Sequence, residues 1–245
     1  MLKASQFEFR NRFWFIGCIY GAGFAMYKID HVNVVQYALD HTIGGNSSHA
    51  DLFVHSAFGI AALLALAAAL IRTWGTAYLR ADVMQDPNVR ADSVVADGPY
   101  RHVRNPLYVG GILLGLAFGF LASRIGAVVI IVGLTIFYLR LIALEEPNLE
   151  REQGERYREF SRRVPRIVPS LTPRIPSSGL KPQWGQAILG ETFMWGFFVG
   201  VAAFAVTLKI AVTWAIMGFA LVVYIVRSYM LYGRRKAAKV PGGQA

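Results

Sequence analysis

Cysteine and acidic residues are scarce in this 245-residue chain, and the scarcity of cysteine excludes two kinds of structural site. Cys18 is the one cysteine, so the chain can form neither an internal disulfide nor a zinc site built from cysteines. Charged residues make up 16% of the chain, with 25 Lys and Arg against 15 Asp and Glu. The sequence also shows no repeat of fixed period and no low-complexity tract, which argues against a repeat protein or a compositionally biased one.

Long apolar runs are what the chain has in quantity. Hydrophobic residues make up 55% of the sequence, and they gather in runs that approach the roughly 20 residues a helix needs to cross a bilayer. The sequence therefore predicts an all-α integral membrane protein with about six transmembrane helices. The expected spans are residues 13–29, 52–71, 107–123, 125–144, 188–208 and 210–232.

The basic residues are distributed unevenly among the connecting segments. They cluster before the first span, between the second and third, between the fourth and fifth, and after the sixth, whereas the alternate loops hold only Lys28, Arg124 and Lys209. Because positive charge accumulates on the cytoplasmic side, we expect both termini and the polar site to be cytoplasmic. Topology and anionic lipid headgroups thus account for the net charge of +10, and nucleic acid is not an expected partner.

Turn-forming residues divide the chain into four parts. The clearest boundary is the proline-rich stretch at 171–184. We expect two transmembrane helices and their loops in 1–93, and a core made of a helical hairpin plus an amphipathic helix in 94–170. The proline-rich linker at 171–184 would then lead to a C-terminal transmembrane hairpin and basic tail in 185–245.

A first polar cluster occupies residues 98–108, between the second and third expected spans. Asn105-Pro106 is a turn signal, and it predicts that a helix starts at Pro106. The free backbone amides of that helix start, together with Arg101 and Arg104, would attract a carboxylate or phosphate. Taken alone, this cluster is explained more simply by ordinary anchoring of arginine and tyrosine at the membrane interface.

A second polar cluster begins with Glu145 and Glu146 at the end of the fourth expected span. A helix C-terminus disfavours negative charge and adjacent carboxylates repel, so we expect compensation from Arg140 or from a ligand. Pro147 is expected to restart the helix. An amphipathic interfacial helix should follow, with an apolar stripe made of Leu149, Tyr157, Phe160 and Val164.

Taken together, the two clusters resemble a known family, the isoprenylcysteine carboxyl methyltransferases and their phospholipid methyltransferase relatives. The similar elements, in chain order, are Gly98-Pro99-Tyr100-Arg101, Arg104-Asn105-Pro106-Leu107-Tyr108, Gly110, Glu145-Glu146, and Val164-Pro165-Arg166 with Pro169. Several uncommon elements recur in order at suitable spacing, between about residues 94 and 169. The resemblance implies a membrane-embedded enzyme that transfers a methyl group from S-adenosylmethionine, with the cofactor held at the cytoplasmic face.

The resemblance also implies which residues form the site, because in that family the Arg-His-Pro or Arg-Asn-Pro tract and the paired glutamates line the cofactor pocket. The expected cofactor contacts are Tyr100, Arg104, Asn105, Tyr108, Glu145 and Glu146, and the candidate catalytic residues are Arg140, Glu145 and Glu146. Arg140 would orient an anionic acceptor. An amine acceptor would instead need one of the glutamates to take its proton, and the sequence does not say which glutamate serves the cofactor.

Other functions remain open at this stage. The acceptor of a methyltransferase would be an isoprenylcysteine carboxylate, a phospholipid amine or a small thiol, and the partners would be S-adenosylmethionine and the bilayer. Sterol reductases share a related helical core, so an NADPH-dependent reductase is an alternative, as is a non-catalytic membrane protein. No metal is expected, because the histidines and aspartates of the first external loop match no ligand spacing and are more simply solvated. The oligomeric state cannot be predicted.

Overall fold

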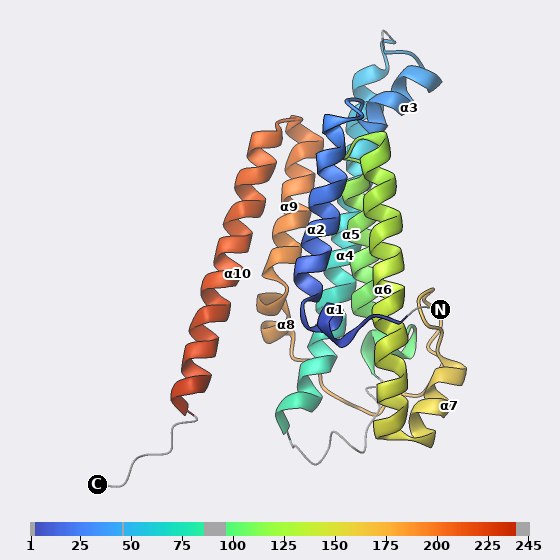
Figure 1. Ribbon diagram of the computed structural model, residues 1–245, viewed down its shortest axis with the longest axis vertical. Coiled ribbons are helices and arrows are strands. Elements are labelled where there is room, and N and C mark those ends of the chain that lie inside the picture. Colours follow the sequence, from blue (N-terminus) through green and yellow to red (C-terminus); the bar gives the residue numbers. More distant parts are fainter. Residues whose placement is uncertain (1–2, 46, 86–96, 239–245) are drawn as a thin grey trace.

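The computed structural model describes residues 3–45, 47–85 and 97–238, and within these ranges the chain is helical, with no β-sheet. Figure 1 shows the longer helices packed side by side as one elongated bundle. The helices are α1 (Gln6–Arg10), α2 (Arg12–Ala25), η1 (Met26–Lys28), α3 (Val34–Thr42), α4 (Ala50–Gln85), η3 (Gly98–Arg101), α5 (Pro106–Gly119), α6 (Arg124–Gln153), α7 (Glu155–Arg163), α8 (Trp184–Gly190), α9 (Thr192–Thr207) and α10 (Ile210–Ala238).

The apolar helices identify a membrane protein, as the sequence predicts. Three described helical segments are long and apolar enough to cross a bilayer, namely Ala50–Leu79, Arg124–Gln153 and Ile210–Arg227. The pair α8 and α9, bent by 62°, would supply a fourth span if it crosses as one unit. Helices α2 and α5 have only 14 residues each, so the prediction of six spans goes beyond what helix length supports.

Helix α4 is the central element of the bundle. It packs against α5 and α9, while α6 packs against α5 and α2, and α10 lies at the outer edge beside α9 (Figure 1). The interior is apolar, with Ile130, Leu134 and Leu141 of α6 almost completely buried. Large apolar side chains also remain exposed on the outside of the bundle, among them Trp14, Leu63, Val128 and Phe219. An exterior of this kind suits contact with lipid.

An ion pair fastens the end of the bundle at which α3 lies. Asp30 is buried, and it accepts hydrogen bonds from the Arg124 guanidinium (2.8 Å from Nη2) and from the backbone amide of Ile125 (3.0 Å). The same guanidinium lies 4.8 Å from the ring centre of Tyr37. Asp30 follows η1 and Arg124 opens α6, so the pair ties α2 and η1 to the start of α6.

This ion pair should make stability depend on pH. The hydrogen bonds from Arg124 and Ile125 lower the pKa of Asp30 from 3.8 to about 2, so the folded state holds the ionised form more tightly than the unfolded state does. The stabilisation is present above pH 3.8 and is lost as the pH falls through about 2. We therefore expect Asp30→Asn to melt below the unmodified protein near neutral pH, with the difference closing in acid. A difference that does not change with pH would contradict this role of the carboxylate.

Two details of the second polar cluster differ from expectation. Helix α6 continues through Pro147 to Gln153, and the break comes at Gly154, whose φ of +62° suits a residue without a side chain. Helix α7 is amphipathic as predicted, but Tyr157, Phe160 and Val164 are buried and pack together with Ile175. The protein's own chain thus covers these three residues of the predicted stripe, whereas the fourth, Leu149, belongs to α6 and is exposed.

The proline-rich stretch is attached closely to the preceding part of the chain. The amide of Arg174 donates to the carbonyl of Arg101 (2.8 Å), and the Arg101 guanidinium donates to the carbonyl of Ile175 (2.9 Å). Further along, the amide of Gln183 donates to the carbonyl of Ala77 in α4 (3.0 Å). The predicted boundary between 93 and 94 lies outside the described residues.

Candidate functional site

Two chain segments meet beside the start of α5 and bring the two polar clusters together. The amide of Arg104 donates to the carbonyl of Pro165 (2.8 Å), and the amide of Ser170 donates to the carbonyl of His102 (3.0 Å). The loop before α5 is therefore paired with the segment after α7. Helix α5 begins at Pro106, as the Asn-Pro turn signal predicts, with its N-terminus at this junction.

Glu146 is the centre of a cluster of donors at this junction. One carboxylate oxygen lies 3.3 Å from Arg104 Nη1 and accepts from Asn105 Nδ2 at 3.3 Å, while the other accepts from Arg166 Nη2 at 2.6 Å. The Glu146 and Arg104 side chains are only 9% and 13% exposed. The predicted residues Arg104, Asn105 and Glu146 thus come together, and Arg166 joins them. Its place in the Val-Pro-Arg element was the only sequence signal for this role.

Glu145 faces a different group from its neighbour. Consecutive residues of an α-helix point about 100° apart, so the two carboxylates diverge. Glu145 accepts a hydrogen bond from the Tyr108 hydroxyl (2.8 Å), which ties the end of α6 to the first turn of α5. The Tyr108 ring in turn lies 5.5 Å from the ring of Tyr138. The structure therefore joins the predicted residues Tyr108 and Glu145 as a second pair beside the Glu146 cluster.

Tyr100 is a buried residue of η3, next to this site. Burial raises the pKa of its phenol well above the usual value, so the hydroxyl stays protonated and acts as a neutral polar group. The turn before it is held by Asp97, which accepts hydrogen bonds from Ser177 (2.5 Å) and from the amides of Ser178 and Leu180 (3.1 Å each). The proline-rich stretch thus fixes the position of Tyr100 through Asp97.

Arg140 lies apart from this constellation. Its guanidinium forms an ion pair with Glu8 of α1, with a distance of 2.8 Å between Nη1 and Oε1. Helix geometry explains the separation, because residues five apart point about 140° away from one another, so Arg140 and Glu145 leave α6 on different faces. The compensation expected from Arg140 for the paired glutamates is instead supplied by Tyr108 for Glu145, and by Arg104 and Arg166 for Glu146.

The donors at this junction fit a ligand that carries a carboxylate. Arg104 and Arg166 bring two positive charges to the single charge of Glu146, which leaves one positive charge in excess. The Nε of Arg104 is buried and has no hydrogen-bond partner among the described residues. No side chain caps the N-terminus of α5, which also lies at this junction and carries the positive end of the helix dipole. An anionic group can satisfy these donors, and Tyr108 and Tyr100 supply aromatic rings nearby.

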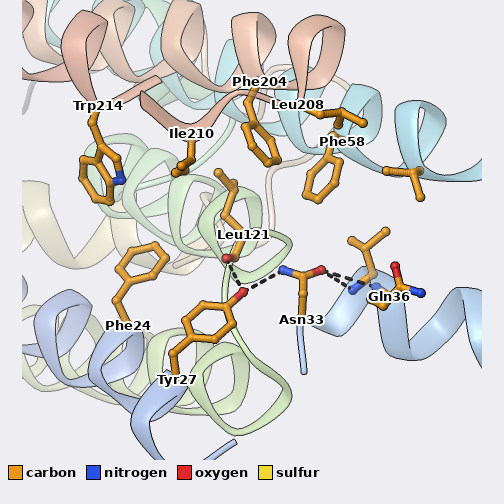
Figure 2. A pocket seen from close by; sticks show the side chains of 12 residues that line it. Phe24, Tyr27, Asn33, Gln36, Phe58, Leu121, Phe204, Leu208, Ile210 and Trp214 are labelled. Atoms are coloured by element: carbon orange, nitrogen blue, oxygen red, sulfur yellow. Dashed lines mark hydrogen bonds between the residues drawn. The ribbon is translucent and has the colours of Figure 1, made fainter. Parts of the chain in front are cut away.

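A cavity of about 530 Å³ lies at the other end of the bundle, where α3 is attached. Its wall is mostly apolar, with Phe24, Phe58, Phe204 and Trp214 around it (Figure 2). The polar groups at its edge are engaged already, because Asn33 donates to the Tyr27 hydroxyl, and that hydroxyl donates to the carbonyl of Leu121 (2.9 Å each). This cavity therefore offers no charged group for catalysis. No metal-binding group of three or more ligands occurs among the described residues.

Comparison with known proteins gives a family match for the middle of the chain. Residues 56–156 match the family model of phospholipid methyltransferases. The match includes Tyr100, Arg104, Tyr108, Glu145 and Glu146, and it ends before Arg166. Searches of the curated proteins and of the solved structures found no significant match.

Proposed function

Residues 56–156 form a phospholipid methyltransferase domain, and from this premise we propose that the protein is an S-adenosylmethionine-dependent methyltransferase with a lipophilic acceptor. The family match over residues 56–156 and the apolar helices support a membrane methyltransferase in general. The observation that carries the finer proposal is the junction at the start of α5, where an excess positive charge, an unpaired guanidinium nitrogen and a helix N-terminus without a side-chain cap converge. This donor set suits the carboxylate end of the cofactor.

The proposal gives separate roles to the two glutamates. Both oxygens of Glu146 are engaged by protein donors, so we assign it to holding Arg104, Asn105 and Arg166 in place. Glu145 is held by the single neutral donor Tyr108 and is the better candidate for contact with the cofactor's hydroxyl or ammonium groups. Tyr100 or Tyr108 would contact the adenine ring or the sulfonium. The cofactor, when bound, supplies a methyl group on a positively charged sulfur, which is already activated for transfer.

Because the methyl group is activated, the chain has to place the acceptor in line with it and to exclude water. A carboxylate or thiolate acceptor is anionic near neutral pH and needs no strong base. If the acceptor is an amine, Glu145 is placed to take the proton, since Glu146 is saturated by its arginines. Arg140 can receive an anionic acceptor only if its ion pair with Glu8 opens. We therefore propose that its resting role is to hold α1 against α6.

Methyl transfer tests this proposal directly. The purified protein in nanodiscs would be given S-adenosylmethionine labelled in its methyl group, and separate panels of phospholipids with amine headgroups, prenylated cysteine compounds and hydrophobic thiols. We expect label to appear in one acceptor class and to depend on Arg104. If none of the panels is labelled, and NADPH instead supports reduction of a sterol or related lipid, the chain is a reductase and the proposal is wrong.

A further inference from the structure

A buried ion pair joins the centre of the bundle to its C-terminal helices. Arg72 of α4 donates two hydrogen bonds to Glu191, at 2.8 Å from Nε to Oε2 and 3.2 Å from Nη2 to Oε1. The Thr76 hydroxyl donates a third, at 2.7 Å to Oε1. The Arg72 and Glu191 side chains are 19% and 6% exposed. Burying two charges in an apolar helix bundle is costly, so this pair is a candidate for a functional role.

Arg72 also contacts the helix that begins at the proposed cofactor site. Its Nη1 donates to the carbonyl of Leu107 in the first turn of α5 (3.2 Å). Its aliphatic stem lies against Gly110, where an added Cβ would meet Arg72 Cγ at 2.4 Å. A side chain at Gly110 would therefore displace Arg72. The arginine thus sets how α4 and the first turns of α5 pack together.

The same stretch of α4 contacts the loop that carries Tyr100 and Arg104. Tyr78 and Trp74 lie against Gly98, and the ring of Trp74 is 5.9 Å from the ring of His102. Gly75 allows Pro106 and Leu107 to approach, since an added Cβ would lie 3.1 Å from the Leu107 side chain. Residues 72–78 of α4 therefore support the loop before α5 as well as the start of α5 itself.

The partner of Arg72 comes from outside the phospholipid methyltransferase domain. Glu191 lies at the bend between α8 and α9, whereas the family match ends at residue 156. Trp195 of α9 adds an uncharged contact to the same part of α4, because its indole Nε1 donates to the Thr73 hydroxyl (3.1 Å). The C-terminal hairpin consequently completes the ion pair that the domain's own Arg72 requires.

We propose that Glu191 is a positioning residue for the methyl-transfer site. It acts through Arg72, which fixes the first turn of α5 and, through the loop that leads into this turn, the Arg104 side chain that receives the cofactor carboxylate. The inference rests on the proposed function only for the identity of the ligand, S-adenosylmethionine. The effect of Glu191 on the position of the loop and of α5 does not require any bound ligand. It makes the C-terminal hairpin a part of the active enzyme.

The test compares Glu191→Gln with Trp195→Phe, which removes an uncharged contact between α9 and the same part of α4. The dissociation constant of S-adenosylmethionine is measured by calorimetry, and amide hydrogen exchange is followed across residues 98–110 without ligand. For Glu191→Gln we expect the dissociation constant to rise about tenfold or more, since small displacements of a positioned group cost one to two orders of magnitude. Exchange in residues 98–110 should become faster. Neither change is expected in Trp195→Phe.

Equal effects in the two variants, or unchanged exchange in Glu191→Gln, would overturn the inference. If Glu191→Gln does not fold, Thr76→Val keeps the charges and removes one hydrogen bond to Glu191, and it should raise the dissociation constant about threefold. Thr76→Val without any change would also overturn it. Failure of the unmodified protein to bind S-adenosylmethionine would contradict the proposed function alone, because the exchange measurement still decides whether Glu191 positions the loop.

Discussion

Replacement of Arg104 by glutamine is expected to weaken S-adenosylmethionine binding by at least tenfold. Arg104 carries the buried Nε that has no partner among the described residues, and it lies beside the N-terminus of α5, which no side chain caps. A hydrogen bond to a charged group contributes about 1.5–3 kcal/mol, which corresponds to roughly 10- to 150-fold in a dissociation constant. The loss should be specific to the carboxylate, so a cofactor analogue without that group should bind both proteins about equally.

Arg158→Gln is the matched control for this variant. Arg158 lies on α7 and forms ion pairs with Glu150 and Glu155, but its side chain is 54% exposed and its partners are exposed as well. Exposed pairs of this kind contribute little, so cofactor affinity should not change. Equal loss in both variants would point to a general effect of positive charge on an anionic ligand. No loss in Arg104→Gln would remove Arg104 from the site.

Replacement of Glu145 by glutamine is expected to lower kcat/KM for methyl transfer by about a hundredfold, with little change in melting temperature. Glutamine keeps an oxygen that can accept from Tyr108, so the link between α6 and α5 survives while the negative charge is lost. Loss of a charge that contacts the bound cofactor or takes a proton from the acceptor typically costs two to four orders of magnitude. Steady-state kinetics with the acceptor class that becomes labelled in the transfer assay would measure it.

The control is Glu150→Gln, the same substitution on the same helix. The Glu150 side chain is 43% exposed and pairs with Arg158 at the surface. Activity should remain unchanged there. If Glu145→Gln retains full activity while Glu146→Gln loses it with an unaltered fold, the assignment of roles to the two carboxylates must be reversed.

Much of the fold follows from local sequence. The apolar runs became helices, and α5 starts at Pro106 because proline suits the first helical position. The prediction that the helix restarts at Pro147 was wrong, because α6 continues through this proline. A membrane helix can contain a proline when its surroundings satisfy the carbonyl that loses its hydrogen bond. The burial of the α7 stripe depends on Ile175, which belongs to a stretch that sequence patterning marks only as a boundary.

The sequence predicted which residues form the site, but only partly which of them contact one another. The family resemblance placed Arg104, Asn105 and Glu146 in one site, and the structure brings these three residues together. Divergence of Glu145 from Glu146 follows from helix geometry, but its partner Tyr108 does not. The ion pairs of Arg140 with Glu8 and of Arg72 with Glu191 join residues 132 and 119 positions apart, and no local pattern encodes them. They arise from the packing of whole helices.

Calorimetric titration of the purified protein in nanodiscs with S-adenosylmethionine and with S-adenosylhomocysteine, with NADPH as the comparison, tests the central claim most directly. The account predicts saturable binding of both adenosyl compounds, lost together in Arg104→Gln, and no binding of NADPH. Binding of NADPH in place of the adenosyl compounds, or binding of none of the three, would contradict it.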